Sequence, residues 1–235
     1  MSDASLRSGD GLFETLRVDQ GEARDVPAHL DRLFASLPRI ALEIPEDREG
    51  LERAIAEAAA GAPRPTARLR LIATRGPAGE PTLRIETFPY QPPSEEDDRQ
   101  GVPAVLLPDL RIDSKSPLAG LKSLSSYQSN HLALARAQAE GAWEALLLNE
   151  HGRLCEGSRS NLALRLDGIL HTPPVSEGCL PGTARRRMIE RGELRERPLD
   201  VEDLDRAEEM FLMNSLVGLL RVKLPILRGA GTVGG

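Results

Sequence analysis

Residues 116–131 read SPLAGLKSLSSYQSNH, and the rest of the chain can be arranged around Lys122 at the centre of this stretch. Lysine is rare in this protein. The chain contains Lys115, Lys122 and Lys223, so 27 of its 30 basic residues are arginine. Only lysine offers an amine that burial can make nucleophilic for Schiff-base chemistry. The stretch therefore predicts a cofactor-binding lysine, and the alternative is an exposed lysine in a loop.

The residues after Lys122 predict a helix. Residues 125–128 fit the S-x-x-Q capping box that opens a helix, and apolar residues then recur at helical spacing. These apolar residues are Leu132, Ala135 and Ala139. Tyr127 falls in the first turn, where its hydroxyl can reach back toward the amine of Lys122. The alternative is a tyrosine that only fills a gap in the packing.

Composition narrows the class of protein. The 235 residues carry a net charge of −6 without a basic cluster, which argues against a nucleic-acid surface. No apolar run approaches the roughly 20 residues that span a bilayer, and Met1 leads into a polar segment without a signal-peptide pattern. We therefore expect a cytoplasmic protein with no membrane partner. Cys155 and Cys179 lack the spacing of a zinc site, so we expect no metal and two reduced, buried thiols.

The first ninety residues alternate between strands and helices. Strand patterns at 11–18 and 23–26 flank a turn at Gln20–Gly21, and similar runs cover 67–74 and 82–88. Between them, Pro27 opens a helix and 46–60 predicts a second one. We expect these residues to form a small N-terminal domain, 1–90.

The second part of the chain is richer in strands. Residues 91–100 (QPPSEEDDRQ) have the composition of a solvated linker, which separates the first domain from a larger one at 101–235. Strands outnumber helices without strict alternation, so the fold class is α+β. Predicted strands cover 102–107, 143–148, 161–166, 169–171, 210–213 and 219–224, and Leu180-Pro181-Gly182 leads into a helix through about Arg191. The glycine-rich tail 229–235 is expected to be disordered.

Four groups of motifs follow one another in the order and roughly at the spacing of one enzyme family. They are GDGLFETLRV with HLDRL in 9–33, LAGLK in 118–122, LCEGSRSNLAL with TPP in 154–174, and LPGTARRRMIE with FLMNSLVGLLRV in 180–222. Together they resemble the class IV aminotransferase family of fold type IV pyridoxal-phosphate enzymes. This family holds branched-chain and D-amino-acid aminotransferases and 4-amino-4-deoxychorismate lyase. The resemblance implies a small N-terminal α/β domain, a larger domain with a mixed, barrel-like sheet, and a homodimer.

The resemblance also implies roles for individual residues. Lys122 matches the lysine that forms the internal aldimine with pyridoxal 5′-phosphate and later moves a proton. Glu156 matches the carboxylate that keeps the pyridine nitrogen protonated, which makes the ring a better electron sink. Arg32 matches the arginine that binds the cofactor phosphate. The other implied cofactor contacts are Tyr127 at the ring oxygen, Asn161 behind the ring, and Thr183, Ala184 and Ser215 at the phosphate.

The segment RLRLIATRG is similar to the one that binds the substrate carboxylate in the family. It contains Arg68, Arg70 and Arg75. Alternate residues of a strand share a face, so Arg68 and Arg70 are expected to point the same way, with Arg75 at the turn. A solvated strand face is the alternative. The sequence also departs from the family, because Ala184 replaces a common threonine, only eight residues precede Gly9, and Arg221 stands where proline is frequent.

Different features of the sequence point to different reactions within this family. LAGLK and the NSL of 214–216 look like 4-amino-4-deoxychorismate lyase, which would release 4-aminobenzoate and pyruvate. Tyr127 looks like the aminotransferases, which would act on branched-chain or D-amino acids with a 2-oxo acid as acceptor. The sequence favours the lyase, with a small-molecule amino substrate. A non-catalytic binding protein that retains the fold is a third reading, and the presence of both Lys122 and Glu156 speaks against it.

Overall fold

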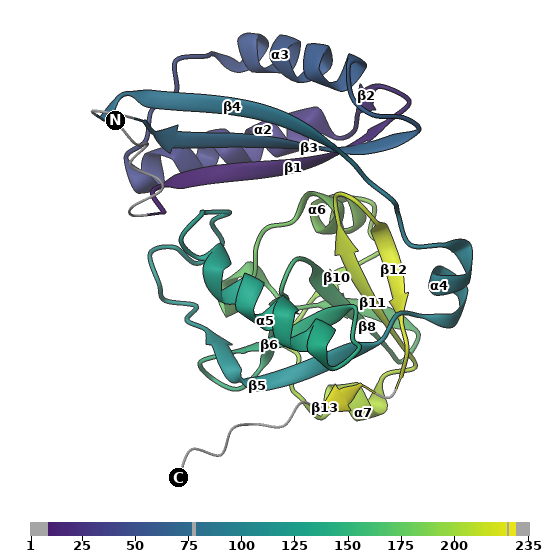
Figure 1. The fold of residues 1–235 in the computed structure, drawn as a ribbon. Coiled ribbons are helices and arrows are strands. Elements are labelled where there is room, and N and C mark those ends of the chain that lie inside the picture. The colour runs from purple at the N-terminus through teal and green to yellow at the C-terminus, as the bar shows by residue number, and fades with distance from the viewer. Residues whose placement is uncertain (1–8, 77–78, 225, 229–235) are drawn as a thin grey trace. The chain divides into compact units, whose positions relative to one another are not determined.

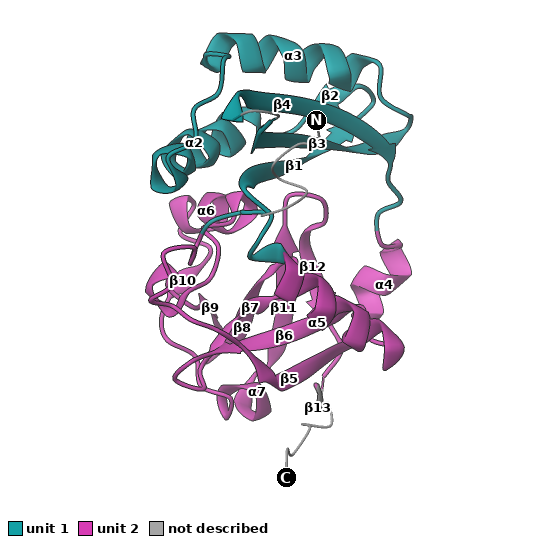
Figure 2. Ribbon diagram, turned by 60° about the vertical axis from the view of Figure 1, so that its left-hand side comes forward, with its two compact units in different colours: residues 1–92, 121–127 teal, residues 93–120, 128–235 magenta. Residues whose placement is uncertain are grey.

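The protein divides into two compact units. The structure is a computed structural model, and it describes residues 9–76, 79–224 and 226–228. Unit 1 consists of Met1–Pro92 and Leu121–Tyr127, and unit 2 consists of Pro93–Gly120 and Gln128–Gly235 (Figure 2). The sequence had placed every residue after 100 in the second domain. The structure instead gives the segment that carries Lys122 to unit 1. The disorder expected for 229–235 lies outside the described residues.

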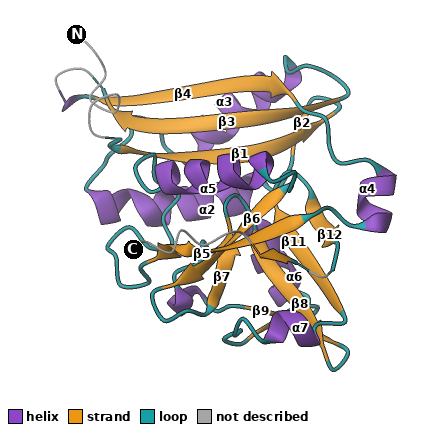
Figure 3. Ribbon diagram, turned by 60° about the horizontal axis from the view of Figure 1, so that its bottom comes forward, coloured by secondary structure: helices purple, strands orange, loops and turns teal. Residues whose placement is uncertain are grey.

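Unit 1 is built on an antiparallel sheet with the strand order β2-β1-β3-β4 (Figure 3). Its strands are β1 (Gly11–Asp19), β2 (Glu22–Ala23), β3 (Thr66–Arg75) and β4 (Pro81–Pro89). The first hairpin turns at Gln20 and Gly21, which both have positive φ as a tight hairpin requires. The second strand of this hairpin covers two residues instead of the expected four. It pairs only with Val18 and Asp19, so the other end of β1 keeps an edge free of β2.

Two helices cover one face of this sheet (Figure 1). They are α2 (Val26–Ser36) and α3 (Arg48–Ala60), and a 3-10 turn, η1 (Leu37–Ile40), follows α2. Helix α3 begins after Asp47, whose side chain accepts a hydrogen bond from the Gly50 backbone N–H. The fully buried leucine and isoleucine side chains of this layer are Leu12, Leu16, Leu30, Leu33, Leu51, Ile55, Leu69 and Leu71. The opposite face carries Phe13 and Arg70, which belong to the candidate site described below.

Unit 2 contains two sheets that share a core. The first has the order β13-β5-β6-β7 and the second β10-β9-β8-β11-β12. Their strands are β5 (Ala104–Ile112), β6 (Glu144–Asn149), β7 (Leu154–Gly157), β8 (Asn161–Leu166), β9 (Ile169–Thr172), β10 (Arg195–Glu196), β11 (Glu209–Asn214), β12 (Gly218–Val222) and β13 (Leu227–Arg228). Both sheets mix parallel and antiparallel pairs. Leucines from both pack into one apolar cluster, so the barrel-like sheet expected from the sequence is two separate hydrogen-bonded sheets.

The helices of unit 2 are α4 (Glu95–Gln100), α5 (Tyr127–Ala139), α6 (Thr183–Glu190) and α7 (Asp203–Arg206), with a 3-10 turn η3 (Val175–Glu177). Helix α4 lies in the expected linker, where Ser94 and Asp97 form a capping box. Among the described helices, none is long and apolar enough to cross a membrane.

The predicted helix after Lys122 is α5. Its buried face is formed by Ala133 and Ala137, which pack against β5 and β6, whereas Leu132 is 55% exposed. Small side chains allow the helix to approach the sheet closely. Before the helix, the Ser126 backbone N–H donates to the hydroxyl of Ser123.

Candidate active site

The segment that carries Lys122 pairs with β1 in unit 1. The Phe13 backbone N–H donates to the Lys122 carbonyl at 3.0 Å, and the Leu124 N–H donates to the Gly11 carbonyl at 2.9 Å. Gly11 is required here, because a Cβ at this position would lie 2.6 Å from the Ala73 carbonyl oxygen. The backbone of Lys122 is therefore fixed by hydrogen bonds to a strand more than a hundred residues earlier in the chain.

Aromatic rings surround the Lys122 amine. Its Nζ donates to the Tyr127 hydroxyl at 3.0 Å and lies 4.5 Å from the centres of both the Phe13 and the Tyr127 rings. The two rings meet edge to face with their centres 4.6 Å apart. Within the described part of unit 1, no carboxylate forms an ion pair with Lys122. This environment leaves the amine available to an electrophile and places a hydroxyl beside it.

The three arginines of the RLRLIATRG segment are separated by the structure. Arg70 lies over the Phe13 ring at 4.4 Å, and its buried Nε has no hydrogen-bond partner among the described residues. Burial, together with the neighbouring charge of Arg68, lowers the pKa of Arg70. Arg68 shares this face of β3 but stacks on Phe88. Arg75 donates to Asp10 and to two backbone carbonyls, which anchor it at the end of the strand.

Arg32 belongs to a buried ion pair. Its Nε donates to Glu14 Oε1 at 2.8 Å, its Nη2 bonds Glu14 Oε2, and His29 Nδ1 lies 2.7 Å from that second oxygen. Burial raises the pKa of Glu14, but the charge and hydrogen bonds of Arg32 and His29 outweigh it and hold the value at about 2. The sequence analysis included Glu14 and His29 only within the GDGLFETLRV and HLDRL motifs and gave neither of them a role.

In unit 2, Glu156 and Asn161 both form hydrogen bonds with the backbone of Leu180. Leu180 donates its N–H to Glu156 Oε2 at 2.8 Å and accepts a hydrogen bond at its carbonyl from Asn161 Nδ2 at 2.8 Å. Glu156 lies near the end of strand β7 and Asn161 begins β8. The two residues therefore fix the segment that leads into helix α6.

Helix α6 begins without a side-chain cap. Gly182 occupies the N-cap, and a Cβ there would lie 2.1 Å from Asn161 Oδ1, so glycine is required. Thr183 and Ala184 follow in the first turn, and both are buried. Backbone N–H groups of a first helical turn have no partner within the helix, and with the helix dipole they favour an anion. The close approach at Gly182 instead packs the Asn161 side chain against the start of the helix.

Ser215 lies in the turn between β11 and β12. Asn214 holds this turn, because its Oδ1 accepts from the N–H groups of Leu216 and Val217. Its Nδ2 also donates to the Arg159 carbonyl at 3.3 Å. Asn214 is a further positioning residue that the sequence analysis included only as part of a motif.

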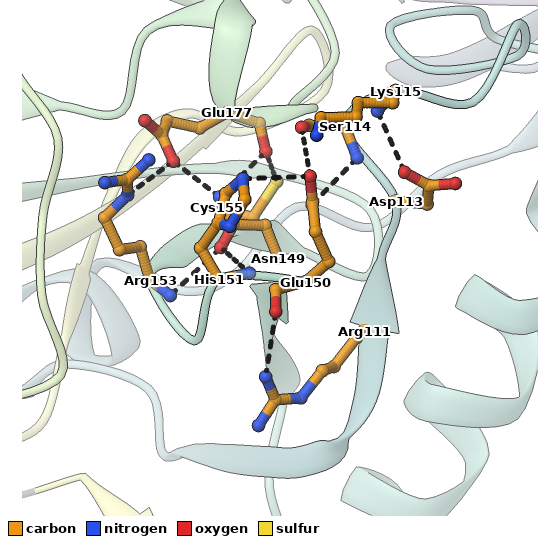
Figure 4. A network of polar contacts seen from close by, with 10 residues as sticks. All are labelled: Arg111, Asp113, Ser114, Lys115, Asn149, Glu150, His151, Arg153, Cys155 and Glu177. Atoms are coloured by element: carbon orange, nitrogen blue, oxygen red, sulfur yellow. Dashed lines mark hydrogen bonds and ion pairs between the residues drawn. The ribbon is translucent and has the colours of Figure 1, made fainter.

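A polar network fixes the other end of the segment before α6 (Figure 4). Asn149 accepts from the N–H groups of His151 and Arg153, and its amide donates to Glu177. Arg153 Nε donates to the same Glu177 carboxylate at 2.7 Å. Cys155 donates its thiol to the Glu177 carbonyl, and burial raises its pKa far above the ordinary range. The structure therefore places Cys155 as a buried, unreactive thiol, and burial likewise raises the pKa of Cys179 to about 12.

The predicted site residues thus form two groups. Lys122 and Tyr127, with Arg70 nearby, gather around Phe13 in unit 1, whereas Arg32 and Arg75 lie in separate ion pairs of that unit. The group in unit 2 consists of Glu156, Asn161, Thr183, Ala184 and Ser215.

Comparison with known proteins identifies the chemistry of these groups. A family model described as amino-transferase class IV matches residues 11–224. The chain belongs to the class IV aminotransferase family. It is therefore a pyridoxal-phosphate-dependent enzyme with the mixed α+β fold of that family. The alternative of a non-catalytic binding protein is wrong.

Relatives of this class IV enzyme differ in their reactions. A candidate branched-chain-amino-acid aminotransferase of Methanocaldococcus jannaschii is 31% identical, covering 94% of this chain and 80% of its own. A bifunctional aminodeoxychorismate lyase and D-amino acid transaminase of Mycobacterium tuberculosis is also 31% identical, and the match covers 94% of this chain and 83% of the relative. Among solved structures, a candidate 4-amino-4-deoxychorismate lyase of Legionella pneumophila has a TM-score of 0.86 at 27% identity, covering 99% and 90%. A hypothetical aminotransferase of Mycobacterium tuberculosis, solved with pyridoxal phosphate bound, has a TM-score of 0.84 at 30% identity, covering 96% and 86%.

The residues present fit pyridoxal phosphate. The cofactor needs an amine for its aldehyde, an acid for its ring nitrogen and donors for its phosphate. Lys122 offers an amine without a carboxylate partner in the described part of unit 1, Glu156 offers an acid, and the first turn of α6 has no side-chain cap.

Proposed function

We propose that this enzyme is a 4-amino-4-deoxychorismate lyase, which converts its substrate to 4-aminobenzoate and pyruvate. The observation that carries the proposal is the similarity over nearly the whole chain to the Legionella pneumophila structure described as a candidate lyase of this kind. The LAGLK segment around Lys122 supports it from the sequence. The Mycobacterium tuberculosis relative with both activities supports it as well.

Each predicted site residue keeps the cofactor role that the family resemblance implies for it. When bound, the cofactor supplies an aldehyde for an amine and a ring that accepts the electrons of a carbanion. Lys122 Nζ is the amine that holds the aldehyde carbon. Glu156 keeps a proton on the ring nitrogen, and Asn161 lies behind the ring. The phosphate is held by the start of α6 at Thr183 and Ala184, by Ser215, and by Arg32.

Arg32 is a proposed phosphate ligand because it matches the arginine of the family motif. Its guanidinium is at the same time held by Glu14, which engages Nε and Nη2. An arginine neutralised in this way attracts the dianion less strongly but is held in one orientation.

The proton steps fall to Lys122 and Tyr127. In the proposed reaction, the substrate amine would displace Lys122 from the aldehyde, and the freed Nζ would remove the proton from the substrate carbon that carries the amine. Tyr127, 3.0 Å away, holds the amine of Lys122 in place and shares its protons. The electrons of the broken C–H bond form the aromatic ring while the C–O bond to the enolpyruvyl group breaks. Protonation of that group then gives pyruvate.

Arg70 is the proposed partner of the substrate carboxylate. Its guanidinium has an unsatisfied buried Nε beside Phe13, so an incoming carboxylate would supply the missing acceptor. Arg68 adds charge on the same strand face. Arg75 is a weaker candidate for binding the substrate carboxylate, because it already donates to Asp10 and to two backbone carbonyls.

The second candidate function is an aminotransferase that acts on branched-chain or D-amino acids. Two observations favour it, namely the Methanocaldococcus jannaschii relative and the hydrogen bond between Tyr127 and Lys122. In this reaction Lys122 Nζ would return the proton, no elimination would follow, and hydrolysis would release a keto acid while the cofactor keeps the amino group. We further propose that the enzyme works as a homodimer, as the family resemblance implies.

One assay separates the two reactions. The purified holoenzyme is given 4-amino-4-deoxychorismate, and 4-aminobenzoate and pyruvate are measured together. The lyase predicts both products in equal amounts. If neither product forms, and D-alanine or leucine instead converts the bound cofactor to its aminated form, the lyase proposal is wrong and the aminotransferase is correct.

A further inference from the structure

The most deeply buried acid of unit 2 lies outside the residues discussed so far. Glu144 begins strand β6, and its side chain is fully buried at 0% exposure. Burial raises the pKa of its carboxyl group, which marks a carboxylate in an environment that disfavours charge. Such a group persists only where it is well bonded. The residues that form hydrogen bonds with the Glu144 carboxylate therefore indicate its role.

Those partners lie almost entirely in the turn between β7 and β8. Ser158 donates its hydroxyl to Glu144 Oε1, and Ser160 donates its hydroxyl to Oε2 at 2.7 Å. The Ala145 N–H also donates to Oε1 at 3.0 Å, and Arg159 Nε lies 3.8 Å from Oε2. One carboxylate therefore holds two hydroxyls of the same short turn.

The turn has little freedom around this carboxylate. A Cβ on Gly157 would lie 2.5 Å from Ser160 Oγ and 3.0 Å from Glu144 Cγ. The Ser158 carbonyl accepts from Asn130 Nδ2 of helix α5 at 2.9 Å. The turn is therefore packed directly onto the Glu144 side chain, and its shape depends on those two oxygens.

Three proposed cofactor residues depend on this turn. Glu156 precedes it directly and Asn161 follows it directly, although the two strands belong to different sheets. The Arg159 carbonyl accepts from Asn214, which holds the turn of Ser215. A change in residues 157–160 would therefore move the proposed ligands of the ring and of the phosphate together.

We propose that Glu144 is a positioning residue for the cofactor: through Ser158 and Ser160, its carboxylate fixes the turn that places Glu156, Asn161 and Ser215. The inference rests on the proposed cofactor roles of those three residues. It gives Glu144 no contact with cofactor or substrate. Its effect is expected in cofactor affinity and in the protonation of the bound cofactor.

The test compares Glu144→Gln with Asp203→Asn as a matched control. Asp203 is also a buried carboxylate of unit 2, but it bonds Arg197 and the Asp200 N–H, away from the 157–160 turn. A glutamine offers one acceptor oxygen and an NH2 group, so one of the two serine hydroxyls can no longer donate to the side chain and must turn to accept from it. Pyridoxal phosphate is titrated into each apoprotein, the pH midpoint of the visible absorbance of the bound cofactor is measured, and thermal unfolding is followed.

We expect Glu144→Gln to raise the dissociation constant of pyridoxal phosphate roughly tenfold, the lower end of the effect of removing residues that orient ligands in metal sites. The pH midpoint should shift with it, because Glu156 is displaced. Asp203→Asn should lower the unfolding temperature without changing either value. Glu144 is only structural, and the inference is wrong, if Glu144→Gln lowers the unfolding temperature while its dissociation constant stays within twofold of wild type and its pH midpoint does not move.

Ser160→Ala provides a second route if Glu144→Gln does not fold. It removes a single hydroxyl and should raise the dissociation constant about threefold in the same direction, whereas an unchanged constant and midpoint contradict the inference. A wild-type protein that binds no pyridoxal phosphate would refute the proposed function and this inference together, whereas wild-type binding with an unaffected variant refutes the inference alone.

Discussion

Replacing Glu14 by glutamine tests the buried ion pair of unit 1. Glu14 is 1% exposed and holds Arg32 and His29. Its pKa falls from the ordinary 4.5 to about 2 in the folded protein. Each tenfold change in an equilibrium is worth about 1.4 kcal/mol, so this difference corresponds to about 3 kcal/mol of stability at neutral pH. Removing the charge also leaves the Arg32 guanidinium buried without its partner, a change that costs about 3–5 kcal/mol in comparable pairs.

The sign of the pH dependence follows from the direction of the pKa change. A folded-state pKa below the unfolded value means that the stabilisation is complete well above pH 4.5 and is lost as the pH falls through 2. At pH 3.5 the contribution is about 2 kcal/mol, about 1.4 kcal/mol less than at pH 7. The difference in stability between wild type and Glu14→Gln should shrink by that amount between the two pH values.

Urea unfolding of the two apoproteins, followed by far-ultraviolet circular dichroism at pH 7 and pH 3.5, measures this difference. Other acids titrate equally in both proteins and cancel in the comparison. Glu57→Gln on the exposed side of α3 is the control, and it should change the free energy of unfolding by less than about 0.5 kcal/mol. A Glu14→Gln protein whose deficit is below about 1 kcal/mol, or is the same at both pH values, would refute the reasoning.

Three further predictions concern Lys122 and the residues that position it. Lys122→Ala should abolish the visible absorbance of lysine-bound cofactor while pyridoxal phosphate still binds reversibly, and Lys115→Ala should retain that absorbance; spectra with and without borohydride decide. Gly11→Ala should lower the free energy of unfolding by about 2 kcal/mol or more, because its Cβ would lie 2.6 Å from a carbonyl of β3. Gly61→Ala, whose Cβ has no neighbour closer than 3.9 Å, should change it by less than about 0.5 kcal/mol in the same denaturation assay. Tyr127→Phe keeps the ring but loses the hydroxyl, so we expect turnover to fall roughly a hundredfold, the lower end of the range of general acid–base partners, with the unfolding temperature unchanged.

Local signals in the sequence were sufficient to predict most elements of the fold. The hairpin at Gln20–Gly21, the helix that Pro27 opens, and the start of α6 after Gly182 each depend on residues within one turn. The order of the motifs in addition predicted the family. The scarcity of lysine in the composition pointed to Lys122, although its role stays a prediction. These inferences succeed because capping, turn formation and binary patterning act over a few residues.

Tertiary structure alone decided how distant segments combine. The sequence placed Lys122 in the second domain, but hydrogen bonds to Phe13 and Gly11 make its segment part of unit 1. The partnership of Arg32 with Glu14, and the joint hold of Glu156 and Asn161 on Leu180, were equally invisible in the sequence. Each of these contacts depends on strand register and on burial, which are set by the packing of the whole unit. The amino-acid sequence therefore determined which chemical groups the enzyme has, whereas the packing of its sheets decided which of them meet.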